Sequence, residues 1–106
     1  MESSDTALIG GPGIGHTILR DLLRPHIDPH SPENIMIFGT GPLLGTPMPA
    51  AGKCYLVTKY SMPASKKQEK YFISSSMFGS NRFGTMMKNA GYDHLVIIGR
   101  AEKPCY

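Results

Sequence analysis

Hydrophobic positions recur with a helical period near the start of the chain and again near its end. The first stripe repeats about every four residues and comprises Ile14, Ile18, Leu19, Leu22 and Leu23. It predicts a helix over about 14–23, ended by Pro25 because the residue before a proline avoids the helical region. The second stripe has i, i+3, i+4 and i+7 spacing at Phe83, Met86, Met87 and Ala90. It predicts a helix over about 82–90, with Gly91 as its left-handed stop.

Short apolar runs bounded by glycine or turn residues predict the strands. These runs are Ile35–Phe38, Cys54–Thr58 and His94–Ile98, with a further short strand at Tyr71-Phe72-Ile73. The polar segments 60–70 and 74–81 are expected to form loops. The order of helix, three strands, helix and strand predicts an α+β fold with two short helices and a mostly antiparallel sheet. Residues 1–6 are predicted to be a disordered tail, and residues 7–106 a single domain.

Composition and charge narrow the class of protein. The 106-residue chain is 41% hydrophobic and 18% charged, which is typical of one folded domain rather than a disordered segment. Its net charge is +3, and its basic residues are scattered apart from a cluster at 66–70, so we expect no nucleic-acid partner. No apolar run approaches the ~20 residues that span a bilayer, and the polar N-terminus does not resemble a signal peptide. We therefore expect a cytoplasmic protein without a membrane partner.

The glycine-rich run Gly10–Gly15 precedes the first predicted helix and raises the question of a phosphate-binding loop. Counted from Gly11, the dinucleotide fingerprint requires a glycine at the position that holds His16. Pro12 also removes an N–H group that a phosphate would use. The favoured interpretation is a structural turn at the helix entry, with a nucleotide-binding loop as a minor alternative.

The other reactive side chains predict no catalytic or metal centre. The four histidines are dispersed, and His26 and His30 lie in a proline-rich turn, where we expect solvated side chains rather than metal ligands. Cys54 and Cys105 lack the spacing of metal ligands; free thiols are favoured, and a disulfide between them is left open. Most internal methionines fall on apolar faces, which predicts core positions. We predict no catalytic residue and no metal ligand in this chain.

Five collinear segments resemble the N-terminal domain of the aldehyde ferredoxin oxidoreductases. The family's D-P-x-S-P-E-N run, G-P-L-T-G-T turn and G-[GR]-x-x-V-x-T-K segment are matched at residues 28–34, 41–46 and 52–59. Its F-G-x-x-x-K-x-A-G-Y-D and G-x-A-E-K-P-x-Y segments are matched at residues 83–93 and 99–106. The matches keep the family's order, so the sequence is similar to about one half of that domain.

The resemblance implies one side of a β-sheet saddle that holds a tungsten- or molybdenum-bispterin cofactor. In this family the cofactor serves the two-electron oxidoreduction of an aldehyde or a related substrate. The implied contacts to the cofactor phosphates are Lys53, Gly79, Ser80 and Asn81. The remainder of a parent enzyme is expected to supply the other half of the saddle, a [4Fe-4S] cluster and the substrate channel, with ferredoxin as electron acceptor. The two cysteines of this chain cannot supply the four thiolates of such a cluster.

The sequence also departs from the family at positions near the implied cofactor. The family usually has arginine where this sequence has Lys53, and lysine cannot make the bidentate contact of arginine to a phosphate. The family's pterin-side asparagine aligns with Phe78, and an acidic residue of the family aligns with Met86. The alternative hypothesis is therefore a stand-alone, catalytically inactive binding or assembly module that has no cofactor and covers its unpaired sheet by self-association.

Overall fold

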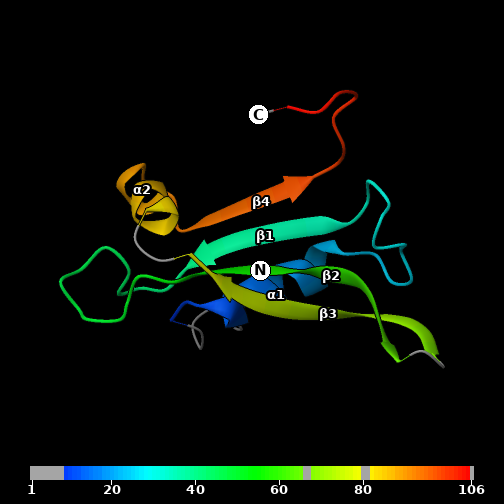
Figure 1. Cartoon of the computed structure of the whole chain (residues 1–106), viewed down its shortest axis with the longest axis horizontal. Helices are drawn as coiled ribbons and strands as arrows, with labels where there is room; N and C mark the ends of the chain where they lie inside the picture. Colours follow the sequence, from blue (N-terminus) through cyan, green and yellow to red (C-terminus); the bar gives the residue numbers. More distant parts are fainter. Residues whose placement is uncertain (1–8, 66–67, 80–81, 106) are drawn as a thin grey trace.

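The computed structural model describes residues 9–65, 68–79 and 82–105, and Figure 1 shows their arrangement. The elements are α1 (Pro12–Leu22), β1 (Ile35–Thr40), β2 (Cys54–Ser65), β3 (Gln68–Phe78), α2 (Phe83–Asn89) and β4 (His94–Ile98). The strands form one sheet in the order β3-β2-β1-β4, and each pairing is antiparallel. This confirms the predicted α+β class with two short helices. Among the described residues, no helix has the length and apolar character needed to cross a membrane.

The helix α1 packs across β1 and β2 on one face of the sheet, and Figure 1 shows it behind these strands. It begins at Pro12, two residues earlier than predicted, because proline is favoured in the first turn of a helix. Gly15 and Leu19 are its buried residues. A Cβ atom on Gly15 would lie 2.7 Å from Cε2 of Tyr55, so the missing side chain lets the helix backbone lie directly on the sheet. The core on this face comprises Leu19, Ile35, Ile37, Tyr55 and Val57.

The opposite face of the sheet, hereafter the open face, is also apolar. Because side chains alternate between faces, the strand registers place there Met36, Phe38, Leu56, Phe78, Leu95 and Ile97. The helix α2 covers one end of this face. Gly84 of α2 is buried, and a Cβ atom there would lie 2.3 Å from Sγ of Cys54. The remainder of the open face stays largely exposed.

The helix α2 ends as the sequence predicts. The N–H of Gly91 donates to the carbonyl of Lys88 at 2.9 Å, and the N–H of Tyr92 donates to the carbonyl of Met87 at 3.0 Å. Gly91 has φ of 88°. This pair of bonds is the Schellman motif, which requires a left-handed residue after the last helical turn.

The loops predicted at 60–70 and 74–81 were wrong over most of their length. Residues up to Ser65 belong to β2, and the range Gln68–Phe78 forms β3. The two strands make a long hairpin whose register shifts around Pro63, as expected where proline interrupts a ladder. The sequence pattern missed this hairpin because its exposed strands carry polar residues and therefore show no hydrophobic period. The strands are held together by backbone hydrogen bonds instead.

The predicted core role of the methionines was also wrong. Met87 is buried, but the other internal methionines are exposed by 38–71%, namely Met36, Met48, Met62, Met77 and Met86. Met36 lies on the open face, and Met86 lies on the outer side of α2. Met36 and Met86 belong to apolar stretches of the sequence, as predicted, but the described residues provide no second layer to cover them, and Met48 lies in the connection between β1 and β2.

The D-P-x-S-P-E-N run forms a turn that joins α1 to the sheet. The side chain of Asn34 donates from Nδ2 to the carbonyls of Pro29 at 2.8 Å and Lys59 at 2.9 Å, and its Oδ1 accepts from the N–H of Ile35 at 3.0 Å. Upstream, Oδ1 of Asp28 accepts from the N–H of the residue two positions later, which is an Asx turn. Within this chain, the motif that carries much of the family resemblance therefore has a structural role.

Candidate functional site

The glycine-rich connections meet at one end of the sheet, hereafter the loop end. The register pairs Thr40 with Cys54 and Cys54 with Phe78, while Gly39 pairs with His94. The end of β1, the start of β2, the end of β3 and the start of β4 therefore lie beside one another. Figure 1 shows α2, the connection 41–53 and the start of α1 on this side of the molecule.

The connection 41–53 is an ordered series of turns. The N–H of Leu44 donates to the carbonyl of Gly41, and the N–H of Thr46 donates to the carbonyl of Leu43, both at 3.2 Å. Leu44 is buried and lies under α2, since a Cβ atom on Gly84 would be 2.9 Å from its Cδ1. One anchored leucine thus holds the connection while most of its other residues stay exposed.

Two of the four predicted cofactor-binding residues lie next to one another at the loop end. Lys53 precedes Cys54 and Gly79 follows Phe78, so both flank the last pair of the β2–β3 ladder. Lys53 is exposed. Gly79 has φ of 65°, and no atom lies within 4 Å of the position of a Cβ, so its backbone is accessible. The other two predicted residues, Ser80 and Asn81, lie outside the described residues.

A shallow cavity of about 450 Å³ opens beside Lys53. It is lined by Gly45, Thr46, Met48, Ala50, Ala51, Gly52, Lys53 and Thr85. Gly45 has φ of 86° and nothing within 4 Å of a Cβ position, so a ligand can approach its backbone closely. The cavity thus offers one cation, exposed backbone and the hydroxyl groups of two threonines. This chemistry fits contact with an anionic group, and the residues that line the cavity include no histidine, cysteine or carboxylate.

Sequence reasoning missed Thr85 and Lys88, which join α2 to this region. Nζ of Lys88 lies 3.1 Å from a carboxylate oxygen of Asp93 and donates to the carbonyl of Pro42 at 3.4 Å. The lysine is part of the F-G-x-x-x-K segment of the family resemblance, and that segment was the available signal. Thr85 lies on the first turn of α2 and had no signal, because only the packing of α2 places it beside the connection 41–53.

Phe78, which the sequence resemblance aligned with the family's asparagine, lies in an aromatic cluster. The rings of Phe38, Phe78 and Phe83 lie with centroids 5.7–5.9 Å apart in edge-on or tilted contacts. Phe78 is therefore part of the packing that holds α2 on the open face, since such aromatic pairs add to the energy of burial. It offers no polar group to a cofactor.

Neither cysteine is placed as a metal ligand. Cys54 is buried and Cys105 is exposed, and both are free thiols, as the sequence favoured. Burial raises the pKa of the Cys54 thiol, which makes this thiol unreactive. His26 and His30 are exposed turn residues, as predicted. The described part of the chain contains no group of three or more histidine, cysteine, aspartate or glutamate side chains suited to a metal ion.

A buried tyrosine, Tyr55, and a half-buried histidine, His94, lie on the α1 face near the loop end. The rings of Tyr55 and His94 are 6.0 Å apart, and burial leaves Oη of Tyr55 and Nε2 of His94 without a hydrogen-bond partner among the described residues. Burial raises the pKa of Tyr55 to about 12 and lowers the pKa of His94 below its usual 6.5. Both groups are therefore neutral at pH 7, so neither can serve as an anion or a cation in a binding site.

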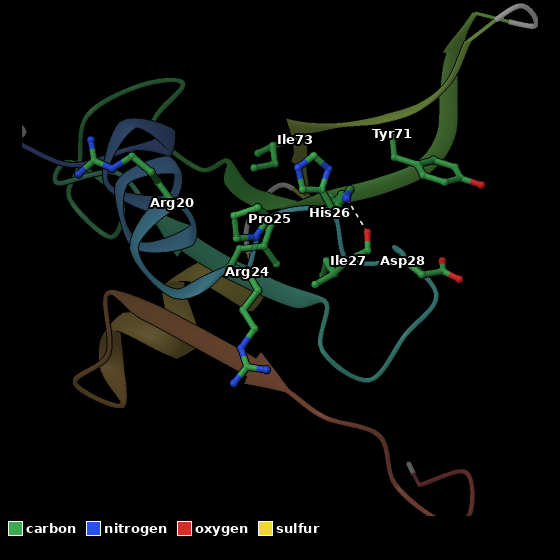
Figure 2. A pocket seen from close by; sticks show the side chains of 10 residues that line it. Arg20, Arg24, Pro25, His26, Ile27, Asp28, Tyr71 and Ile73 are labelled. Atoms are coloured by element: carbon green, nitrogen blue, oxygen red, sulfur yellow. Dashed lines mark hydrogen bonds between the residues drawn. The ribbon is translucent and has the colours of Figure 1, made fainter.

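A second cavity, of about 780 Å³, lies at the opposite end of the sheet from Lys53. It is formed by the C-terminal part of α1, the turn 23–28 and the neighbouring parts of β2 and β3. Figure 2 shows that the guanidinium groups of Arg20 and Arg24 point in different directions, and Arg20 is paired with Asp21 at 3.0 Å. Nζ of Lys59 donates to the carbonyl of Ile27. The basic groups thus have separate local partners or orientations and do not converge on one ligand.

Comparison with known proteins places these features in context. The family model described as "Aldehyde ferredoxin oxidoreductase, N-terminal domain" matches residues 1–106. The tungsten-containing aldehyde ferredoxin oxidoreductase of Pyrococcus furiosus is 39% identical over 98 residues, which cover 92% of this chain and 15% of that protein. The glyceraldehyde-3-phosphate:ferredoxin oxidoreductase of the same organism is 37% identical over 84 residues, covering 79% of this chain and 12% of that protein.

A solved structure has the same fold. The active-site complex BamBC of benzoyl coenzyme A reductase, in complex with 1,5-dienoyl-CoA, matches with a TM-score of 0.78 and 32% identity, covering 97% of this chain and 15% of that chain. The present chain therefore spans about 15% of the length of the relatives that it matches over most of its own length.

Proposed function

Because the chain belongs to the aldehyde ferredoxin oxidoreductase family, as its N-terminal domain, we propose that it forms one side of a tungsten- or molybdenum-bispterin site. The relatives are oxidoreductases, and the names of several state that they contain tungsten. In the proposal this domain is part of a larger enzyme for two-electron oxidoreduction of an aldehyde or a related substrate. The remainder of that enzyme supplies the [4Fe-4S] cluster and passes electrons to ferredoxin. A cytoplasmic location remains a prediction from the sequence.

The observation that carries the proposal is the position of Lys53, which lines an open cavity and lies beside Gly79 at the end of the β2–β3 ladder. A cofactor phosphate needs a cation and close backbone approach. Lys53 supplies the cation, and the backbone of Gly45 and Gly79 is open on the side where a Cβ would lie. These residues fit the anionic end of the cofactor. Ser80 and Asn81 belong to the same proposal, as predicted from the sequence.

The cofactor supplies the redox chemistry when bound, and the residues of this chain bind and orient it. Lys53 holds a phosphate by charge, and the anchored connection 41–53 keeps that charge at the edge of the sheet. No residue of this chain is assigned a catalytic role. The cavity of about 450 Å³ is open to solvent, so the polypeptide beyond this domain must supply the opposite wall and exclude water.

A second candidate function is a stand-alone module without the cofactor. It is favoured by the aromatic cluster, in which Phe78, aligned by the sequence resemblance with the family's pterin-side asparagine, contributes no polar group. Lysine in place of arginine at position 53 points in the same direction, because it weakens the expected phosphate contact.

The two functions are separated by titrating the ¹⁵N-labelled chain with inorganic pyrophosphate and following amide shifts by NMR. We expect saturable shifts at Gly45, Lys53 and Gly79. Lys53→Ala should abolish these shifts, and Lys53→Arg should strengthen the affinity for pyrophosphate by about three- to tenfold, because arginine binds phosphate through two N–H groups. Lys103→Ala is the control, since this exposed lysine lies in the C-terminal segment, and it should leave the shifts unchanged. Equal shifts in the Lys53→Ala and unsubstituted chains would contradict the proposal and favour the second function.

A further inference from the structure

The helix α2 holds the connection 41–53 at two places. Gly84 is buried in α2, and a Cβ atom there would lie 2.9 Å from Cδ1 of Leu44. One turn later, Nζ of Lys88 donates to the carbonyl of Pro42 at 3.4 Å. Residues four positions apart lie on the same side of a helix, so one side of α2 makes both contacts. The first contact is packing against a buried leucine, and the second depends on one ammonium group.

The position of that ammonium group is set by Asp93. Nζ of Lys88 lies 3.1 Å from Oδ1 of Asp93. The carbonyl of Asp93 accepts from the N–H of Thr40 at 3.1 Å and from its Oγ1 at 3.3 Å, and Thr40 is buried. Two hydrogen bonds therefore fix the backbone of Asp93 to the end of β1, and its carboxylate holds the lysine at a defined place beside Pro42.

The lysine side chain has little freedom of its own. It is only 21% exposed, whereas lysine side chains are mostly open to solvent. It lies in the last turn of α2, where a cation interacts favourably with the helix dipole. The Schellman motif at Gly91 ends the helix directly afterwards and fixes the path of the chain between Lys88 and Asp93. This short segment therefore presents one ammonium group in a fixed direction.

Pro42 lies where the connection leaves the sheet. It comes two residues after the end of β1 at Thr40, and a Cβ atom on Gly10 would lie 2.8 Å from its Cδ. Proline has no N–H group, so the carbonyl is its one backbone group for hydrogen bonding. The chain before α1 thus lies against the ring of Pro42, while Lys88 binds its carbonyl. The direction in which the connection leaves β1 therefore depends on the contact with Lys88.

We propose that Lys88 is a positioning residue for the anion site. Held by Asp93, its ammonium group fixes the start of the connection 41–53. That connection carries Gly45 and ends at Lys53, so the two groups proposed to meet a cofactor phosphate keep their relative positions. Lys88 is not among the residues that line the cavity, and it acts through the connection rather than by touching the anion. The role rests on the proposed function for its ligand.

The exposure of the ion pair sets the size of the effect. Asp93 is 67% exposed, and pairs of this kind favour the paired arrangement by no more than about fivefold. The buried Leu44 remains as a second anchor, so loss of the pair should loosen the connection without unfolding the domain. The apparent affinity for an anion scales with the fraction of molecules in which the site is in place. We therefore expect affinity to fall by about two- to fivefold when the pair is lost.

Titration of the ¹⁵N-labelled 106-residue chain with inorganic pyrophosphate, followed by NMR, measures this change. Lys88→Met removes the ammonium group and keeps most of the apolar stem, so it should weaken binding by about two- to fivefold. Lys88→Arg keeps a cation that can reach both Asp93 and Pro42 and should restore the affinity. Lys103→Met is the matched control, because it makes the same change of charge at an exposed lysine, and it should leave the affinity unchanged.

Asp93→Asn separates positioning from simple attraction between charges. The substitution removes a negative charge, so Coulomb attraction alone would strengthen the binding of an anion. Loss of the pair with Lys88 instead predicts binding that is weaker by about two- to fivefold, with no further loss when Lys88→Met is added. Tighter binding in Asp93→Asn, additive losses in the double variant, or unchanged binding in Lys88→Met overturns the proposal.

Amide hydrogen exchange of the free chain tests the same contact without an anion. Leu44 and Thr46 donate their N–H groups within the connection, and both should exchange about two- to fivefold faster in Lys88→Met than in Lys103→Met. Val57, in the internal strand β2, should exchange equally in both, which excludes a general loss of stability.

The two readouts also distinguish this role from the proposed function on which it rests. If pyrophosphate binds none of the variants and not the unsubstituted chain, the proposed function fails and the positioning role fails with it. If pyrophosphate binds through Lys53 but Leu44 exchanges equally in Lys88→Met and Lys103→Met, the positioning role alone is overturned. Faster exchange together with weaker binding in Lys88→Met and in Asp93→Asn is the result that supports it.

Discussion

Replacing Gly39 by alanine is the sharpest test of how the core on the α1 face is built. Gly39 lies in β1 opposite Tyr55 of β2. A Cβ atom on Gly39 would lie 2.2 Å from both Cζ and Oη of Tyr55, where an ordinary contact is about 3.5–4.0 Å. The ring must therefore move by more than about 1 Å, since the two strands are both internal to the sheet and hold their backbones in place.

The surroundings of Tyr55 decide what that movement costs. The ring is 2% exposed, and its other side lies against Gly15 of α1, so it cannot shift without displacing the helix. If the core accommodates the methyl group, overpacking costs about 1–3 kcal/mol. If the ring is expelled, a tyrosine that buries ~150–250 Å² loses about 4–6 kcal/mol at 25 cal/mol per Å². We expect the free energy of unfolding to fall by about 3 kcal/mol or more, between the cost of overpacking and the cost of expelling the ring.

Urea denaturation at 25 °C measures the change, with Gly41→Ala as the matched control. Gly41 is two residues further along, has no atom within 4 Å of a Cβ position and has no positive φ, so its substitution should change stability by less than about 1 kcal/mol. In a double-mutant cycle, Tyr55→Leu should relieve most of the cost of Gly39→Ala, because the clashing atoms are removed. Equal stabilities for Gly39→Ala and Gly41→Ala would refute this account of the core.

Three further outcomes follow from individual contacts. Asn34→Ala should lower the free energy of unfolding by about 2–4 kcal/mol, measured by urea denaturation, because the four hydrogen bonds of its side chain are lost together. In the native chain Cys105 should react with a thiol reagent rapidly and Cys54 only at the rate of unfolding, because Cys54 is buried and its thiol pKa is raised; equal rates would contradict this. The pKa of Tyr55 is about 12 in the folded state against an ordinary 10. Its contribution to the free energy of unfolding is therefore complete below pH 10 and is lost as the pH rises toward 12. Tyr55→Phe should remove about 2–3 kcal/mol of this alkaline loss in thermal or urea unfolding, and an unchanged alkaline profile would contradict the raised pKa.

The candidate site was only partly accessible from the sequence. Lys53 and Gly79 were predicted by resemblance to family motifs, but their adjacency depends on the register of β2 and β3, which pairs Cys54 with Phe78. Thr85 was missed because a residue on a short helix has no recognisable pattern until the helix is packed. The resemblance identified Phe78 as a departure from the family, but only the structure shows that its ring packs with two other phenylalanines.

The features that the sequence alone could predict are those set by interactions between residues close together in the chain. The two helical stripes, the apolar runs of β1 and β4 and the glycine stop at Gly91 were all correct, because each depends on residues within a few positions of one another. The family was likewise apparent from ordered motifs.

Tertiary structure decided the features that depend on distant residues. The long β2–β3 hairpin is held by a ladder between polar strands, and Tyr55 fits only because Gly15 and Gly39, far apart in the sequence, both lack a side chain beside its ring. The exposure of the methionines and of β4 was decided in the same way, since a hydrophobic period shows which face is apolar but not whether another layer covers it.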